Sequence, residues 1–217
     1  MININAYNYH FSIGSNCRVA TSLIELNLRK FSTNFDWGFF TPKSFYLAYI
    51  DNFQELINFS HNKLSQSENT YQHIIDNWIS KYNFKPYMFR FAHRSHKNED
   101  TVRRRAIRLK DTIENGNNKI LFIYNHIPIH LMSDRAHKKW SNKLLKEEGE
   151  DIFDLKYLQL LKDVLPDNVD LLLLHYEELN MKFKNVYCQF INYEESEVKH
   201  KDWDQQLIIK HIKSLLN

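Results

Sequence analysis

The fold is decided by the stretch Lys-Ile-Leu-Phe-Ile-Tyr at residues 119–124. Its apolar residues follow one another directly. A strand with one solvent-exposed face would instead alternate apolar with polar residues. We therefore predict a strand that is buried on both faces. The stretch before it is helical in pattern and rich in arginine, and Asn-Gly-Asn-Asn at 115–118 ends that helix. A helix followed by a doubly buried strand is typical of parallel α/β sheets.

The rest of the chain alternates in the same way between short apolar runs and longer helical patterns. We predict further strands at residues 9–13, 87–92, 169–174 and 186–191, the last at an edge of the sheet, and an extended segment at 31–37. We predict helices at 17–28, 42–59, 71–82, 100–114, 130–148, 152–165 and 204–216. The pattern indicates one α/β domain over residues 1–217, with a helical insertion at about 42–82. Its expected architecture is three-layered, with a mostly parallel sheet between helices, like flavodoxin or the SGNH hydrolases.

Composition excludes several classes of function. The 29 basic and 26 acidic residues leave a net charge of only +3, which is too small to indicate nucleic-acid binding. Cys17 and Cys188 cannot form a disulfide framework and match no zinc motif, so we predict no metal, no cofactor and a reduced, cytoplasmic setting. The N-terminal residues do not resemble a signal peptide, and no apolar run approaches the roughly 20 residues of a membrane span. The sequence leaves the oligomeric state open.

Cys17 is the first candidate functional residue. It follows the strand predicted at 9–13 and the turn Gly14-Ser15-Asn16, and it opens the next helix. The unpaired N–H groups and the dipole at a helix start favour thiolate, the nucleophilic form of cysteine. The same N–H groups can stabilise an oxyanion on an attacked carbonyl. The alternative is that Cys17 is a small buried residue that packs the helix on the sheet.

Ser15 and Asn16 are candidates for capping this helix, and also for donating hydrogen bonds to a substrate or an oxyanion. Ser15 is in addition the rival nucleophile, because a Gly-Ser turn after a first strand also suits serine hydrolases. Capping is the simpler role for it.

Polar residues end several of the predicted strands. In open parallel sheets, ligands bind beyond the carboxyl ends of the strands, so we expect these residues to converge. A nucleophile also needs a base, and the ordinary histidine pKa of about 6.5 suits proton transfer near neutrality. Four histidines are candidates for that base, and each can instead be an ordinary loop residue: His93, His126, His175 and His200. His126 is also a candidate substrate-binding residue.

Asp36 lies between two large aromatic residues, Phe35 and Trp37. A buried carboxylate there needs a partner, such as an imidazole N–H or an arginine. Asp36 therefore either orients a histidine or fixes its loop, and Trp37 is a candidate for substrate contact.

Arg104 and Arg108 share a face of the helix predicted at 100–114 with Asp111, away from the apolar face of that helix. Such a face is commonly solvated, but arginine also suits a bound carboxylate or phosphate. No glycine-rich nucleotide loop accompanies it.

The order of these motifs resembles a family of bacterial and viral proteins grouped as papain-like cysteine peptidases. The resemblance rests on Gly-Ser-Asn-Cys at 14–17, Phe-Asp-Trp at 35–37, Phe-Ala-His at 91–93, Arg-Arg-Ala-Ile-Arg at 104–108 and Leu-Phe-Ile at 121–123. It covers roughly the first 125 residues. The resemblance implies Cys17 as the nucleophile, His93 as its base and Asp36 as a supporting acid.

Three hypotheses of function follow. The first is a cysteine-dependent hydrolase or acyltransferase that acts on an ester, thioester or amide of a small molecule, glycan or peptide. The second is a glycan- or nucleotide-sugar-handling transferase in which Cys17 is structural and Arg104 and Arg108 bind the substrate. The third is a non-enzymatic interaction module.

Overall fold

A parallel sheet forms the centre of the protein. The computed structural model describes residues 2–13, 17–36, 38–58, 90–91, 99–128, 154–195 and 204–216. Within these ranges β1 (Tyr9–Ser12), β4 (Ile120–His126), β5 (Val169–His175) and β6 (Val186–Phe190) pair side by side in the order β1-β4-β5-β6. All three pairings are parallel. The predicted parallel sheet is therefore confirmed, with β6 at its edge.

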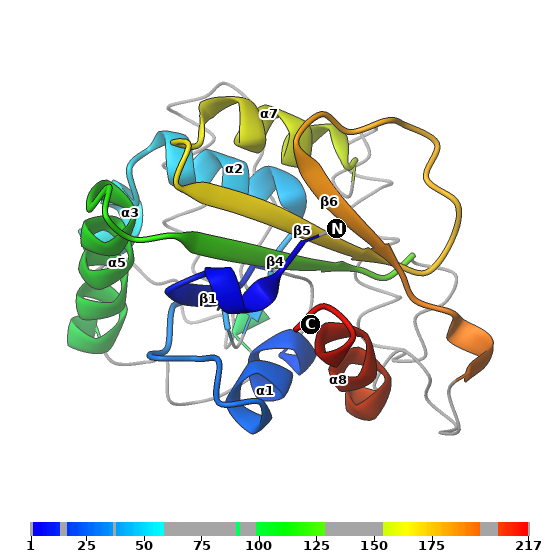
Figure 1. Cartoon of the computed structure of the whole chain (residues 1–217). Helices are drawn as coiled ribbons and strands as arrows, with labels where there is room; N and C mark the ends of the chain where they lie inside the picture. Colours follow the sequence, from blue (N-terminus) through cyan, green and yellow to red (C-terminus); the bar gives the residue numbers. More distant parts are fainter. Residues whose placement is uncertain are drawn as a thin grey trace.

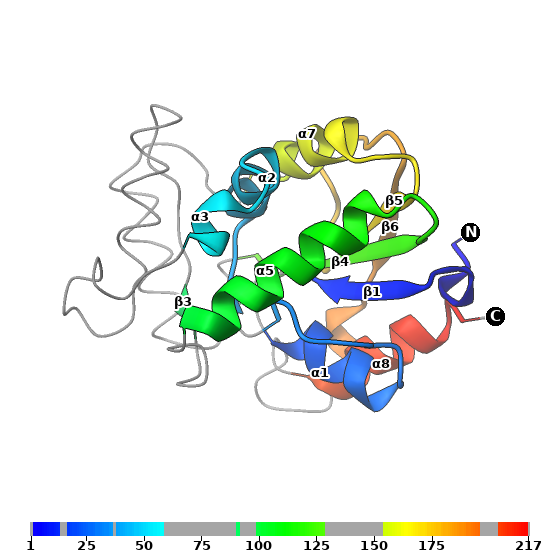
Figure 2. The ribbon, with the colours of Figure 1, turned by 90° about the vertical axis from the view of Figure 1, so that its left-hand side faces the viewer.

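Helices cover both faces of this sheet, as Figures 1 and 2 show. The helices α1 (Arg18–Glu25) and α8 (Gln205–Lys213) lie on one face. The other face is covered by α2 (Pro42–Ile50), α5 (Glu99–Glu114) and α7 (Lys156–Val164). The three-layer α/β architecture is confirmed. Two short 3-10 helices, η1 (Ile4–Ala6) and η5 (Tyr193–Glu195), are also described.

Alternation along β4 divides the apolar core into two parts. Phe122 and Tyr124 pack into the cluster that includes α2, α5 and α7, whereas Leu121 and Ile123 pack into the cluster with α1 and α8. Because successive side chains of a strand point to opposite faces, a strand between two helical layers needs apolar residues at every position. This is why the stretch at 119–124 shows no alternation.

One predicted strand belongs to a different sheet. The strand expected at 87–92 is described at β3 (Arg90–Phe91), which pairs antiparallel with β2 (Gly38–Phe39) in a separate two-stranded sheet. The sequence pattern suggested that this strand belongs to the parallel sheet. That prediction is wrong for the described residues of the strand, Arg90–Phe91. A local apolar pattern indicates a strand but cannot say which partner it has.

The segment predicted as extended at 31–37 is an irregular loop over its described residues, 31–36. Side-chain hydrogen bonds fold it back on itself. The backbone N–H of Phe35 donates to Thr33 Oγ1 at 3.2 Å, and the backbone N–H of Thr33 donates to Asp36 Oδ2 at 2.8 Å. Such short-range bonds from Thr and Asp compete with strand pairing.

Two predicted helices end earlier than expected, for the same reason. The helix predicted at 17–28 ends at Glu25, because Asn27 takes the left-handed conformation with φ of 56°. The helix predicted at 42–59 is broken into α2 and α3 (Gln54–Ile57) by Asn52, at φ 54°, and Phe53, at φ 55°. In both places the amide two residues beyond the cap bonds back to the helix, which is the Schellman arrangement.

The helices predicted at 71–82 and 130–148 lie outside the described residues. Among the helices that are described, none combines the length and the apolar character needed to cross a bilayer.

Phe35 should be a main anchor of the loop at 31–36. It is 1% exposed, and its ring lies 4.7 Å from that of Phe40 and 4.6 Å from that of Phe45. We expect Phe35→Ala to lower the free energy of unfolding by about 3–5 kcal/mol. Ile107→Ala, at a side chain 40% exposed on α5, is the control and should change it by about 0.5 kcal/mol or less. Urea denaturation measures both, and an equal, small effect would contradict the role of Phe35.

Candidate functional site

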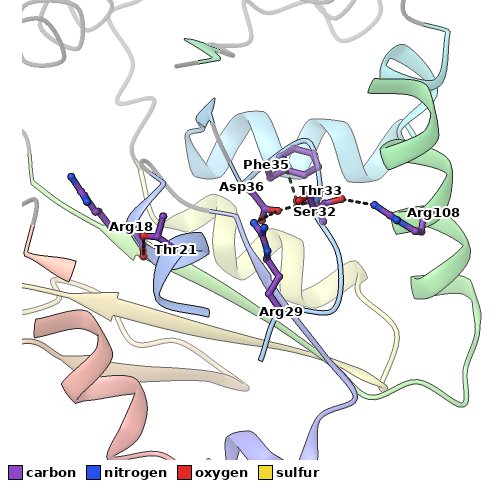
Figure 3. Close-up of polar contacts among 8 residues, drawn as sticks. All are labelled: Arg18, Thr21, Arg29, Ser32, Thr33, Phe35, Asp36 and Arg108. Atoms are coloured by element: carbon purple, nitrogen blue, oxygen red, sulfur yellow. Dashed lines mark hydrogen bonds and ion pairs between the residues drawn. The ribbon is translucent and has the colours of Figure 1, made fainter. Parts of the chain in front are cut away.

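Cys17 occupies the N-cap position of α1, just beyond the carboxyl end of β1. Its carbonyl accepts the first helical hydrogen bond, from the N–H of Thr21 at 2.9 Å. Figure 3 shows the start of this helix, where Thr21 Oγ1 donates to the carbonyl of Arg18. The predicted strand–turn–helix is therefore confirmed on both sides of the turn.

The thiol of Cys17 is half-buried, and this decides its protonation. Burial raises the pKa of the thiol, while the nearby Arg18 guanidinium and the residue's own backbone N–H lower the pKa by less. The direction is opposite to the one expected from the helix start alone. Cys17 is therefore a protonated thiol at neutral pH in this structure, and a base must remove its proton before it can attack.

Two buried polar residues lie on the same face of the sheet as α1. Ser12 ends β1 and is the register partner of Ile123, which packs in the cluster with α1 and α8. Asn125 lies two residues beyond Ile123 and is fully buried. The Ser12 hydroxyl is also fully buried and has no hydrogen-bond partner among the described residues. Ser12 was not a candidate in the sequence, since only its register with a buried strand distinguishes it from an ordinary strand serine.

His126 and His175 lie together on the opposite face. They are register partners at the ends of β4 and β5. Their side chains lie on the same face of the sheet as Tyr124 and Leu173, which pack in the cluster with α2, α5 and α7. The expected meeting of strand ends at one edge of the sheet is confirmed for these two histidines. Strand alternation, however, directs them away from the face that carries Cys17.

The two histidines have different surroundings. Burial, together with the nearby His175, lowers the pKa of His126 to about 4, so its ring is neutral at pH 7. His126 Nδ1 has no hydrogen-bond partner among the described residues. His175 Nδ1 lies 2.9 Å from the carbonyl oxygen of Glu177, which can only accept. His175 therefore carries its proton on Nδ1, and Nε2 is left as the acceptor when the ring is neutral.

Asp36 is fully buried and fixes the loop around it, as Figure 3 shows. Its Oδ2 accepts hydrogen bonds from Arg29 Nη1 at 3.2 Å and from the backbone N–H of Thr33 at 2.8 Å. Burial raises the pKa of Asp36 to about 6, although Arg29, Thr33 and Arg105 all favour the ionised form. These bonds match the loop-fixing role that was one of the two readings of Asp36. The sequence indicated that a partner was needed but not that it is Arg29.

Arg108 is engaged in the same loop. Its Nη2 donates to the carbonyl of Ser32 at 2.9 Å, as Figure 3 shows. Its guanidinium lies 4.1 Å from the ring centre of Phe31. Burial and the neighbouring Arg104 lower the pKa of Arg108. Arg108 therefore joins α5 to the loop at 31–36.

Arg104 lies in an open groove of about 330 Å³ along α5. Every residue that lines the groove belongs to this one helix: Asp100, Arg103, Arg104, Ile107, Arg108 and Asp111. The two acidic residues offset part of the positive charge. The groove matches the solvated face that the sequence allowed for, and within the described ranges no side chain of another element lines it.

Five sequence candidates lie outside the described residues: Ser15, Asn16, Trp37, His93 and His200. Among the candidates that are described, His126 and His175 are brought together, and Arg108 of α5 bonds to the loop that contains Asp36. Cys17 makes no side-chain cap hydrogen bond and forms no disulfide. The described residues also hold no group of three or more His, Cys, Asp or Glu side chains that fits a metal ion.

No protein-family model, curated protein or solved structure matches the chain. The inference of function therefore depends on the residues themselves.

The raised pKa of Cys17 should be visible in its alkylation. In a Cys188→Ser background, we expect the pH midpoint of iodoacetamide labelling at Cys17 to be higher in the native chain than in the urea-unfolded chain. The reason is that burial disfavours the thiolate only in the folded state. Mass spectrometry after timed labelling measures both midpoints. A native midpoint below the unfolded one would mean that the helix start outweighs burial.

Asp36 and His126 should affect stability in opposite directions as the pH changes. The pKa of Asp36 is higher in the folded than in the unfolded chain. Its contribution to the free energy of unfolding is therefore full below the unfolded-state pKa of about 4, and it is lost as the pH rises through about 6. The pKa of His126 is lower in the folded than in the unfolded chain. Its contribution to the free energy of unfolding is therefore full above the unfolded-state pKa of about 6.5, and it is lost as the pH falls toward about 4.

Urea denaturation from about pH 4 to 7 tests both groups. Relative to the natural protein, Asp36→Asn should gain stability as the pH rises, and His126→Gln should gain stability as it falls. Each change should be on the order of 1–3 kcal/mol across the window. Curves that run parallel to that of the natural protein would show that neither group has the shifted pKa.

Proposed function

We propose that this protein is a cysteine-dependent hydrolase or acyltransferase, with Cys17 as its nucleophile. One observation carries the proposal: Cys17 begins α1 directly beyond β1, at the edge where parallel sheets bind their ligands. The substrate class is an acyl ester, thioester or amide of a small molecule, glycan or peptide.

The chemistry proceeds in two steps. A histidine takes the thiol proton of Cys17 as sulfur attacks the substrate carbonyl, and the tetrahedral oxyanion faces the N–H groups at the start of α1. The histidine then returns the proton to the leaving group, which departs and leaves a thioester on Cys17. Water, in a hydrolase, or an acceptor nucleophile, in an acyltransferase, takes the acyl group and regenerates the thiol.

The need for a base follows from the burial of Cys17. Because burial raises the thiol pKa, a resting thiolate is scarce and the proton must move during the attack. The resemblance to the papain-like peptidases implies His93 for this role. His175 is the described alternative, because its Nδ1 bond to Glu177 leaves Nε2 to accept. Asp36 holds its loop through Oδ2, which bonds to Arg29 and Thr33, and its Oδ1, which has no partner among the described residues, is the atom that would orient the base.

Substitution of Cys17 should abolish acyl transfer. We expect Cys17→Ala to lower kcat/KM at least about 100-fold on p-nitrophenyl esters or acyl thioesters, because the thioester intermediate can no longer form. Cys188→Ala is the matched control and should leave the rate unchanged, since Cys188 lies on the exposed strand β6. Intact-mass measurement should find the acyl adduct in Cys188→Ala and not in Cys17→Ala. Equal rates and equal adducts in the two variants would refute the proposal.

The base is identified by comparing three variants in the same assay. His93→Ala, His175→Ala and His126→Ala differ only in which candidate is removed, and the true base should cost about 100- to 10,000-fold in kcat. Its loss should also remove the acidic limb of the pH–rate profile. A profile that keeps this limb in all three variants would exclude them all as the base.

A further inference from the structure

The groove along α5 contains two guanidinium groups that form no ion pair with a described residue. Arg104 and Arg108 both line it, four residues apart on one face of the helix. At this spacing the Cβ atoms of a helix are about 5–6 Å apart. Neither side chain takes part in any of the ion pairs within the described ranges. Two like charges therefore lie one turn apart in a hollow of about 330 Å³.

The third arginine of the groove, Arg103, is already engaged. Its Nε donates to the carbonyl of Ile57 at 3.1 Å, and its Nη1 lies 4.0 Å from Asp100 Oδ1. This pair balances one positive charge with one negative charge. In the described lining, the exposed Asp111 is then the carboxylate that remains against the other two arginines. The lining therefore keeps an excess of positive charge.

Arg108 is held in position before any ligand arrives. Its Nη2 bonds to the carbonyl of Ser32, as Figure 3 shows, and its guanidinium lies against the ring of Phe31. Its Nη1 is open to solvent and makes no hydrogen bond within the described ranges. A guanidinium that is fixed on two sides loses little further conformational freedom when it binds an anion.

The chemistry that fits two such groups is that of a phosphate. One guanidinium can occupy both oxygens of a carboxylate through two parallel hydrogen bonds, whereas a tetrahedral phosphate has oxygens left for a second guanidinium. The charges of the pair favour the same ligand. Burial is the first reason why the pKa of Arg108 is lowered, and the positive charge of Arg104 is the second. A dianion between the two side chains replaces this repulsion by attraction.

We propose that Arg104 and Arg108 form a binding site for a phosphate group, either free or carried by a small molecule. Arg108 Nη1 and the guanidinium of Arg104 donate to different oxygens of the phosphate. The volume of the groove is at the lower end of the range for small-molecule sites. Because α5 covers the face of the sheet opposite to α1, the inference does not depend on acyl transfer at Cys17.

Isothermal titration calorimetry of the full chain with glycerol phosphate, at constant ionic strength, tests the proposal. We expect saturable binding, and Arg104→Gln should weaken it at least about 10-fold, since its charge-assisted hydrogen bonds are lost. Arg104 is exposed, so this variant should fold like the natural chain. The matched control is Lys110→Gln, which removes the same charge from α5 outside the described groove lining. It should change the affinity by about 2-fold or less.

Asp111→Asn provides a test in the opposite direction. It removes negative charge from the groove and should tighten binding by about 2- to 5-fold. Titration with inorganic phosphate distinguishes the two sources, because equal affinity means that phosphate alone is recognised and weaker affinity means that the attached molecule contributes. Either result supports the site.

Three results would overturn the proposal. The first is the absence of saturable binding of either phosphate compound. The second is an equal loss of affinity in Arg104→Gln and Lys110→Gln, which would indicate only a general effect of charge. The third is that acetate binds as tightly as the phosphates, since a carboxylate needs only one guanidinium.

Discussion

The pairing of β4 with β5 is the constraint on which the rest of the structure depends. These two strands are paired along their whole length, from Ile120 beside Val169 to His126 beside His175. Nearly all of their residues are buried, because helices cover both faces of the pair. A sheet centre of this kind has no room for polar side chains except at its ends. The polar residues of β4 and β5 are accordingly concentrated at the carboxyl edge.

Strand alternation then divides that edge into two chemically different parts. Ser12 and Asn125 lie on the face of α1, which begins at Cys17, while His126 and His175 lie on the face of α2, α5 and α7. A nucleophile at Cys17 and a base at His175 would thus have to meet around the end of the sheet.

The sequence predicted the layers and the four strands of the parallel sheet, because doubly buried strands and amphipathic helices leave unambiguous patterns. It did not predict that Arg90–Phe91 pairs with Gly38–Phe39 apart from that sheet, since partner choice depends on contacts far along the chain. The helix breaks at Asn27 and at Asn52 were missed too, as asparagine tolerates a left-handed turn without requiring one. For the site, the sequence predicted that Cys17 lies at a helix start and that Asp36 needs a partner. That Asp36 is held by Arg29 and that burial raises the pKa of Cys17 follow only from the folded structure.

Two opposing effects on the pKa of the Cys17 thiol determine how the proposed site can react. A helix start favours a thiolate by an electrostatic effect that acts over one turn, whereas burial of the same sulfur disfavours any charge. At Cys17 burial is the larger of the two. A thiol of this kind resists alkylation and oxidation in the resting protein, because both need the thiolate. It becomes a nucleophile only when a base and a substrate carbonyl arrive together, in the way that a serine hydroxyl is activated. The proposed site is therefore best understood as a base-dependent one, whose reactivity depends on proton transfer rather than on a preformed thiolate.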